Sequence, residues 1–175
     1  MTDTSRHLQI FRVALAAATT PEAAFEALCM LTQATVGAKL FTIMSVDMAA
    51  GLARRNFSND PVSYPTSGTK PVQHNSWFDI IHVRGEIFVA NTLAEIADVF
   101  PDHAVIGGLG CGSVVNLPIV LGGSLVATMN ILHEEHYYTD ARVDTVREDL
   151  SLPCMATLAV ARALEGDMDR GILQG

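Results

Sequence analysis

The sequence predicts an α+β fold built on a mostly antiparallel β-sheet, with helices at both ends of the chain. Amphipathic helical patterns cover residues 5–18 and 19–37 at the start, and residues 139–166 at the end. Between them lie two pairs of strand-like segments, each joined by a short turn, in residues 39–58 and 113–133. The connection between these two hairpins carries only short helical and strand patterns.

Composition and charge exclude several classes of protein. The 175-residue chain is 49% hydrophobic and 17% charged, which favours one well-filled domain over disorder. Its formal net charge of -8 and the lack of a basic cluster disfavour nucleic-acid binding, which needs Lys and Arg to neutralise phosphates. No apolar run is long enough to span a bilayer, and the first helical segment lacks the basic start of a signal peptide. Three widely spaced cysteines form no disulfide framework, so we expect a cytoplasmic protein.

The ends of the helices carry sequence signals. A threonine cap before Pro21 predicts the start of the second helix, and Gly37 predicts its end. Thr139 or Asp140 should cap the last helix. Pro153 should kink that helix, because proline has no backbone N–H to donate.

The connection between the hairpins is expected to carry functional loops. Residues 58–73 are rich in proline, serine, glycine and asparagine, and so long a loop in a compact domain is usually functional. A short helix is expected to begin near Asn75 or Ser76 and to stop at Gly85. A short strand and a second short helix should follow it.

The stretch GGLGCGSVVNLPIV, residues 107–120, places four glycines around Cys111. A phosphate-binding loop or a nucleophile elbow would need a helix directly after the glycines, but a strand pattern follows. We therefore predict a flexible loop that leads into a strand. Cys111 is a minority candidate for a reactive thiol, because reactivity requires a cation or a helix N-terminus that lowers its pKa; the alternative is a cysteine that only occupies a turn.

Asn116 and Asn130 interrupt the apolar pattern in the two arms of the later hairpin, which turns at Gly122 and Gly123. Buried amides are costly unless they are hydrogen-bonded, so each needs a partner. With a three-residue loop the two amides lie opposite each other on one face, with Thr128 nearby; with a two-residue loop their faces differ. They either contact a ligand or pair with each other or with a loop backbone.

Aromatic residues gather around the long loop. Trp77, the only tryptophan, lies with His74 and Phe78 directly after this loop, and Tyr64 lies within it. An aromatic lid over a polar sheet floor is typical of a ligand pocket. The alternative for Trp77 and His74 is packing in the core beneath the loop.

Two further clusters are weaker candidates. The segment HEEHYY, residues 133–138, lies where a strand ends and lacks the helical spacing of a zinc motif, so a solvated turn is favoured over a metal site. The pair Arg54 and Arg55 either directs one guanidinium toward an anionic ligand or lies on a solvated edge strand. No carboxylate pair or Ser/His/Asp arrangement emerges, so neither a catalytic group nor a metal ligand is predicted.

The order of these segments resembles a GAF domain, the small-molecule sensory fold related to PAS domains. SVVNLPIVLGGSLVATMNIL is similar to the paired last strands of that family, and YTDARVDTVREDLSLP is similar to the start of its closing helix. TPEAAFEALCMLTQATVGAKLFTIMSVD adds support at the front. The resemblance covers residues 20–165, which leaves residues 1–19 as an N-terminal helix and candidate dimer contact, and residues 166–175 as a C-terminal tail.

The resemblance implies a GAF-like sheet with terminal helices on one face and ligand-pocket loops on the other. The motif of cyclic-nucleotide binders is absent, and Cys111 lacks the adjacent histidine of bilin binders, so ligand and cofactor stay unknown. The pocket floor is expected at residues 113–116 and 128–130, and the lid at residues 58–78 and 101–112. The expected ligand-binding residues are Asn116, Asn130, Thr128, Ser113, Trp77, His74, Tyr64 and His103.

We expect a stand-alone sensory or regulatory domain that binds a small molecule and passes any signal to a separate effector protein. Members of this family commonly pair through their terminal helices, so a homodimer is expected, without nucleic-acid or membrane partners. One alternative is an enzyme that resembles the free methionine-R-sulfoxide reductases and uses Cys111 as its nucleophile. A second alternative is a structural dimerisation module whose pocket is filled with side chains.

Overall fold

A computed structural model describes residues 3–66 and 68–172 of the chain, with side chains up to residue 166. The described residues form two compact units. The first, here called the helical unit, contains the described residues up to Gly37 together with those from Leu152 onward. The second, the sheet unit, is Ala38–Ser151.

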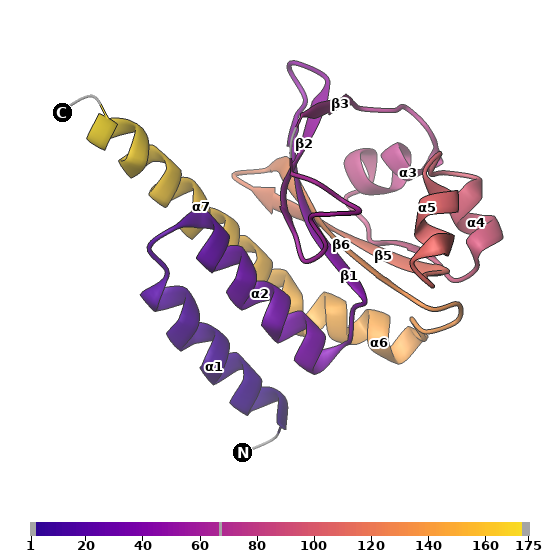
Figure 1. The fold of residues 1–175 in the computed structure, drawn as a ribbon, viewed down its shortest axis with the longest axis horizontal. Coiled ribbons are helices and arrows are strands. Elements are labelled where there is room, and N and C mark those ends of the chain that lie inside the picture. Colours follow the sequence, from indigo (N-terminus) through magenta and orange to yellow (C-terminus); the bar gives the residue numbers. More distant parts are fainter. Residues whose placement is uncertain (1–2, 67, 173–175) are drawn as a thin grey trace. The chain divides into compact units, whose positions relative to one another are not determined.

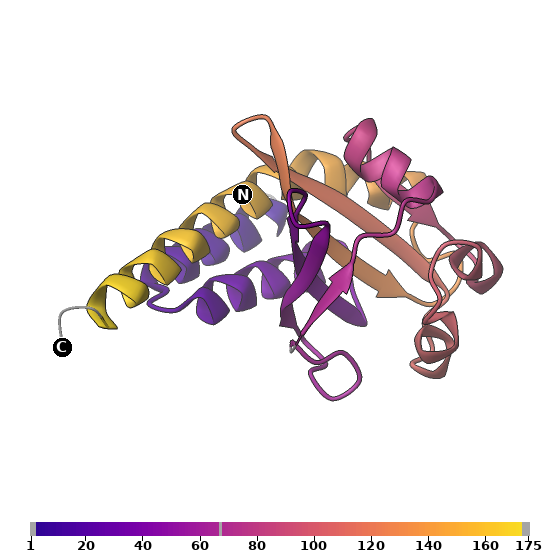
Figure 2. The ribbon, with the colours of Figure 1, turned by 90° about the horizontal axis from the view of Figure 1, so that it is seen from above.

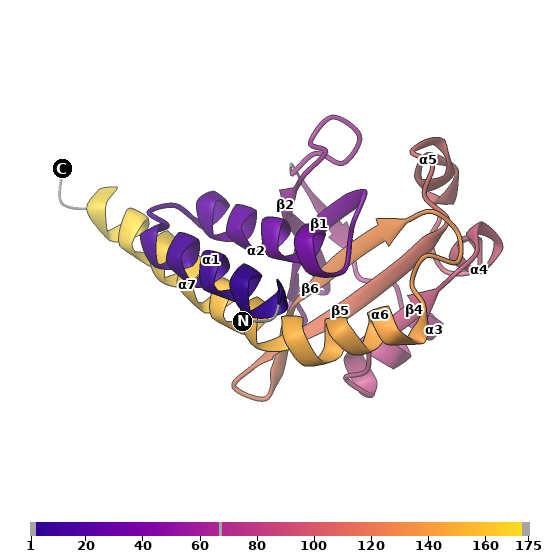
Figure 3. The same ribbon diagram turned by 90° about the horizontal axis from the view of Figure 1, so that it is seen from below.

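The helical unit consists of α1 (Asp3–Ala17), α2 (Pro21–Thr35) and nearly all of α7 (Ser151–Ile172), which run side by side in Figures 1 and 3. The predicted signals of α2 are confirmed. The Thr20 side chain accepts a hydrogen bond from the N–H of Ala23 at 3.2 Å, which satisfies one free donor of the first turn. After the helix, Gly37 takes a φ of 93°, a conformation that glycine adopts without strain.

The sheet unit is built on an antiparallel sheet, and the predicted fold class is confirmed. Within the described residues the sheet has six strands in the order β3-β2-β1-β6-β5-β4, and every neighbouring pair is antiparallel. The strands are β1 (Leu40–Asp47), β2 (Leu52–Ser58), β3 (Thr69–Pro71), β4 (Phe88–Ala90), β5 (Ser113–Leu121) and β6 (Ser124–His133). Strands β1, β6 and β5 form its centre.

Short helices fill the connections around the sheet, and Figures 1 and 2 show those between β3 and β5 to one side of the strands. They are α3 (Ser76–Phe78), α4 (Leu93–Ala97), α5 (His103–Gly108) and α6 (Asp140–Thr145), with π-helical turns at Asp79–Val83 and Val146–Leu150. Two predictions are wrong in detail. The long loop of residues 58–73 contains strand β3, which pairs with the edge of β2, and the loop of residues 101–112 contains helix α5.

The last helical segment deviates from α-helical geometry close to Pro153, the residue that was predicted to kink it. The π-helical turn Val146–Leu150 comes directly before α7, three residues ahead of Pro153. Pro153 cannot donate a hydrogen bond to the carbonyl group four residues earlier, so the regular ladder cannot continue through this turn. Thr139 is the residue before α6, but its side chain makes no capping hydrogen bond.

The β5–β6 hairpin combines a two-residue turn with a β-bulge. Leu121 pairs with Ser124 across the Gly122–Gly123 turn, and both glycines have positive φ. The register then shifts between Ile119 and Val120. The bulge adds one residue to β6. Beyond it, the two strands therefore pair in the register that was predicted for a three-residue loop.

Candidate ligand-binding site

The sheet unit contains a cavity of about 320 Å³. One side is the face of the sheet formed by alternate residues of β1, β2, β5 and β6, including Leu40, Thr42 and Val114. The other side is formed by the chain around α3 and by the segment from Val99 to Ile106. Most lining side chains are apolar, and the volume lies at the lower end of the range for small-molecule sites.

A chain of side-chain hydrogen bonds crosses the floor of the cavity. The indole N–H of Trp77 donates to Oδ1 of Asn116 at 2.9 Å, and Nδ2 of Asn116 donates to Oδ1 of Asn130 at 2.7 Å. Nδ2 of Asn130 then donates to the hydroxyl of Thr42 at 3.2 Å. The chain therefore connects α3 to β5, β6 and β1. It gives each buried amide the partner that desolvation requires.

The hairpin bulge makes this chain possible. A two-residue turn in an unbroken register would place Asn116 and Asn130 on opposite faces of the hairpin. Because of the bulge, Asn116 pairs directly with Asn130 in the ladder, and Asn130 pairs with Thr42 on the next strand. Neither alternative considered from the sequence describes this combination, since the sequence offered a two-residue or a three-residue loop and no bulge.

Trp77 is held over the floor by the chain before and around it. The side chain of Asn75 accepts a hydrogen bond from the N–H of Phe78 at 3.2 Å, which caps α3. Its Nδ2 donates to the carbonyl of Val99 at 3.2 Å. The indole ring also meets the Phe100 ring edge-on, with centroids 6.4 Å apart. Asn75 thus ties the two segments that form the outer side of the cavity.

A polar corner of the cavity contains Arg55, Tyr64 and Asp102. The Tyr64 hydroxyl donates to Oδ2 of Asp102 at 3.0 Å, and the Arg55 guanidinium lies 4.8 Å from the centre of the Tyr64 ring. Nη1 of Arg55 donates to the carbonyl of Pro65 at 2.9 Å. Burial raises the pKa of Tyr64, and the neighbouring charge of Asp102 raises it further, so the phenol stays a hydrogen-bond donor.

A second bulge turns Arg55 toward this corner. The register between β1 and β2 shifts between Ile43 and Met44, so that Ile43 pairs with Phe57 while Met44 pairs with Arg55. Arg55 and Phe57 would share one face of a regular strand, because side chains alternate. The bulge instead places Arg55 at the cavity and Phe57 against Phe41, with ring centroids 5.9 Å apart.

Five of the eight predicted binding residues line the cavity: Asn116, Asn130, Thr128, Trp77 and Tyr64. The other three lie elsewhere. Ser113 is fully buried, and its hydroxyl donates to the carbonyl of Glu134 at 2.7 Å. His74 is exposed and packs on the Phe78 ring, and His103 contacts the carbonyl of Phe100 through Nδ1.

Seven polar lining residues were not predicted as binding residues: Thr42, Arg55, Lys70, Gln73, Asn75, His82 and Asp102. The sequence offers Arg54 and Arg55 for an anionic ligand, but a strand pattern alone does not show which arginine faces inward. Asp102 directly precedes α5, and His82 lies in a π-helical turn; neither position carries a sequence signature. The sequence does contain a signal for Thr42. It is two residues from both Leu40 and Met44, so in a β-strand all three side chains lie on the same face.

Cys111 is enclosed rather than presented to a substrate. Its side chain is 4% exposed and belongs to an apolar cluster with Leu40, Val114 and Leu132. Burial raises the pKa of this thiol, although Lys39 acts in the opposite direction. A raised pKa disfavours the thiolate, which is the nucleophilic form.

The glycines around Cys111 have packing and turn roles. A Cβ atom on Gly112 would lie 2.2 Å from Cγ of Glu135, so a larger residue there would force the Glu135 side chain to move. Gly110 has a φ of 69°, which a residue with a side chain adopts only with strain. The segment is therefore tightly constrained, and it is less a flexible rim than the sequence predicted.

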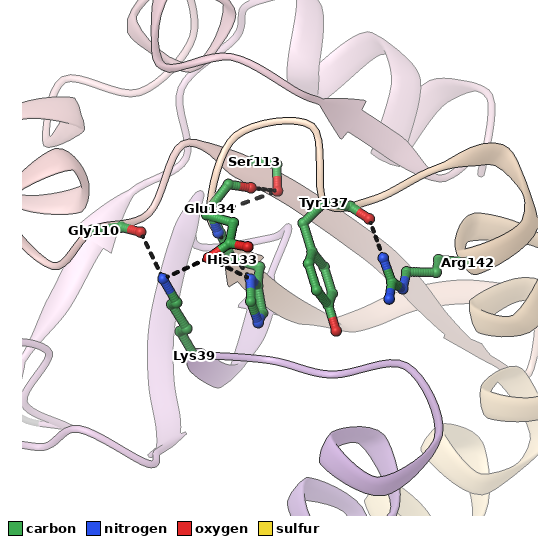
Figure 4. Close-up of polar contacts among 7 residues, drawn as sticks. All are labelled: Lys39, Gly110, Ser113, His133, Glu134, Tyr137 and Arg142. Carbon is green, nitrogen blue, oxygen red and sulfur yellow. Dashed lines mark hydrogen bonds and ion pairs between the residues drawn. The ribbon is translucent and has the colours of Figure 1, made fainter.

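The segment of residues 133–138 secures a turn near the start of β1, as Figure 4 shows. Nζ of Lys39 lies 3.0 Å from Oε2 of Glu134 and donates to the carbonyl of Gly110 at 3.2 Å. The His133 and Tyr137 rings are stacked with centroids 3.4 Å apart. Within residues 3–66 and 68–166, no group of three or more His, Cys, Asp or Glu side chains is arranged to hold a metal ion.

The antiparallel sheet and its helical connections form a GAF-like α+β fold. Solved structures support this assignment over nearly the whole chain. The GAF domain of a phosphoenolpyruvate-protein phosphotransferase from Acinetobacter has a TM-score of 0.70 at 8% identity, covering 93% of this chain and 96% of that one. The corresponding domain from Coxiella burnetii has a TM-score of 0.63 at 16% identity, covering 98% and 99%.

A free methionine-R-sulfoxide reductase from Neisseria meningitidis, solved with its substrate, is also similar, with a TM-score of 0.62 at 13% identity. The similarity covers 93% of this chain and 94% of the reductase. No family model and no curated protein matches the chain. At these identities the likeness establishes the fold, and function has to be argued from the site. No helix in the described part of the chain combines the length and apolar character needed to cross a membrane.

Proposed function

We propose that this chain is a sensory or regulatory GAF domain that binds a small molecule in the cavity of the sheet unit. The observation that carries the proposal is the cavity itself, about 320 Å³ with mostly apolar walls and a short line of polar side chains on its floor. Its combination of apolar walls and convergent polar groups is typical of a ligand site.

A thermal-shift screen of metabolites, nucleotides and haem tests this proposal. A ligand that binds only the folded state should raise the melting temperature in a concentration-dependent way. Ala53→Trp should abolish that shift, because Ala53 lines the cavity and the larger side chain would fill it. Val62→Trp is the matched control, since Val62 is 91% exposed and lies outside the lining. Equal shifts in both variants would contradict the proposed location.

The thiol-enzyme alternative is less well supported, because Cys111 is buried and its pKa is raised. It predicts a thiol-dependent turnover of methionine sulfoxide that Cys111→Ser abolishes. The binding proposal predicts a ligand-induced melting shift that the same substitution leaves in place. The two can therefore be separated with one variant and two assays.

A homodimer through the terminal helices is proposed as the assembled form. Ile10 and Val13, one helical turn apart on α1, are 48% and 58% exposed, and Met30 on α2 is 55% exposed. Adjacent exposed apolar side chains often mark an interface. Sedimentation should show a dimer that Ile10→Glu with Val13→Glu dissociates, whereas Val62→Glu in the sheet unit leaves it intact. A monomeric wild-type protein would contradict the dimer alone.

A further inference from the structure

The polar groups around the cavity are mostly hydrogen-bond donors. In the floor chain each amide oxygen already accepts one bond, from Trp77 or from Asn116. Each amide nitrogen uses one N–H in the chain and retains a second, because an amide carries two. The Thr42 hydroxyl accepts from Asn130, so its own proton stays available for donation. The floor is therefore suited to a ligand that brings acceptors.

Two cations line the cavity, the exposed Lys70 and the half-buried Arg55, and Arg55 is incompletely paired. Its Nε is buried and has no hydrogen-bond partner. Nη1 donates to the carbonyl of Pro65 at 2.9 Å, a neutral acceptor that does not balance the charge. Across the part of the chain that the structure describes, no carboxylate forms an ion pair with this guanidinium. Burial lowers the pKa of Arg55, yet an arginine side chain keeps its charge in a protein.

The nearest acid on the lining does not fill this role. Asp102 contributes to the same polar corner, but its Oδ2 accepts the Tyr64 hydroxyl at 3.0 Å. Its charge favours the protonated guanidinium without an ion-pair contact. A half-buried cation without a counter-ion is costly unless an anion completes it, and a carboxylate matches a guanidinium with two parallel hydrogen bonds.

We propose that the ligand is a small monocarboxylate with an apolar body, its carboxylate bound by the Arg55 guanidinium and its body by the apolar walls. This inference rests on the proposed function and specifies its ligand class. The cavity volume of about 320 Å³ limits the body to the size of a small metabolite. Asp102 and the buried floor amides disfavour larger or more highly charged anions, since every additional charge must be desolvated.

Matched pairs of carboxylates and neutral amides test the charge requirement. The probes are phenylacetate, cinnamate and hexanoate, each compared with its amide by titration calorimetry and by melting shift. At least one carboxylate should bind the wild-type protein about tenfold or more tightly than its amide, as expected for a charge-assisted pair. If no carboxylate binds more tightly than its amide, the proposal is overturned.

Two adjacent arginines provide the matched variants. Arg55→Gln should weaken carboxylate binding by about ten- to hundredfold and leave amide binding nearly unchanged, which also reports that the cavity is intact. Arg55→Lys should fall between the two, because it keeps the charge and loses the fork. Arg54→Gln should have no effect, since Arg54 is exposed and outside the lining. Equal effects at both positions would overturn the proposal.

The two proposals fail in different ways. One outcome separates them: the neutral amides bind, Ala53→Trp abolishes their binding, and Arg55→Gln does not change the ratio of carboxylate to amide affinity. In that case the cavity is a ligand site and the carboxylate class is wrong. If Ala53→Trp changes the binding of no compound in either screen, the proposed function itself is wrong. In the second case the carboxylate proposal is overturned with it.

Discussion

The two faces of the same three central strands are built in opposite ways. On one face Phe41 and Ile131 are fully buried among apolar neighbours, and no partner other than close packing is needed. On the cavity face Thr42, Asn116 and Asn130 are buried as well, but they are polar and must be hydrogen-bonded. Burial alone therefore does not separate stability from function. Costly polar groups beside a cavity indicate function, and tightly packed apolar groups indicate stability.

The largest expected effect comes from breaking the apolar face. Phe41→Ala should lower the free energy of unfolding by about 3–5 kcal/mol, because it removes a fully buried ring that meets Phe57 edge-on. Urea denaturation measures this loss. Val62→Ala serves as the control and should change stability by less than about 0.5 kcal/mol, since Val62 is exposed. A loss below about 1 kcal/mol for Phe41→Ala would contradict the assigned packing.

The cavity face should respond less strongly and through pairing rather than packing. Asn116→Ala leaves the Trp77 indole N–H and the Oδ1 of Asn130 without their partner, so a loss of about 1–3 kcal/mol is expected. Trp77→Phe removes the indole donor from the same chain. The double variant should cost less than the sum of the two single variants, as measured in urea. Strict additivity would show that the hydrogen bond contributes little.

The apolar face ends in a titratable group, which gives a smaller and pH-dependent effect. His133 lies on the row of Val115 and Ile131, and burial lowers its pKa from the usual 6.5, with Lys39 and Arg142 acting in the same direction and Glu134 opposing them. Because the pKa of His133 is lower in the folded state, the unfolded chain binds the proton more readily than the folded protein does. The stability supplied by neutral His133 is therefore complete above about pH 6.5 and is lost as the pH falls below it.

Urea titrations between about pH 7 and 5 measure this dependence. His133→Phe keeps a ring for stacking on Tyr137 and removes the titration, so its stability should vary less with pH than that of the wild-type protein. Lys39 lowers the pKa of Glu134 from 4.5, so this carboxylate contributes stability that is lost at more acidic pH, outside the measured range. An unchanged pH profile in His133→Phe would refute the assignment.

The smallest effect is expected for the buried thiol beside the cavity. Cys111→Ala should leave the affinity for any ligand found in the screen within about twofold, because Cys111 is outside the lining. The native thiol should also react slowly with a disulfide reagent, since it is buried and burial raises its pKa. Rapid labelling at neutral pH, or loss of binding in the variant, would revive Cys111 as a functional group.

Local signals predicted most of the fold. Thr20, Pro21 and Gly37 set the limits of α2 through backbone chemistry that acts within a few residues, and the structure confirms them. Strand β3 and helix α5 were not predicted, because neither is specified by signals within a few residues. Three strand residues at a sheet edge form only because β2 offers a partner, and a six-residue helix with two glycines has little intrinsic preference to form.

The site was less predictable, because two bulges decide which side chains meet in it. The composition of the hairpin drew attention to Asn116 and Asn130, but the bulge near Val120 sets them opposite each other. The bulge between Ile43 and Met44 likewise selects Arg55 for the cavity. A bulge reflects packing of the whole sheet, so the strand pattern alone does not reveal it. Predictions from alternation hold on each side of a bulge and fail across it.

The hydrogen bond between Trp77 and Asn116 gives the protein an intrinsic optical probe. Trp77 is the only tryptophan in the chain, so all indole fluorescence comes from one ring at the edge of the cavity. Its N–H is bonded to the floor chain that ends at Thr42. Occupation of the cavity would alter the polarity and hydrogen bonding around this ring, and therefore its emission wavelength and intensity. Ligands can thus be detected in the unmodified protein, without an added dye.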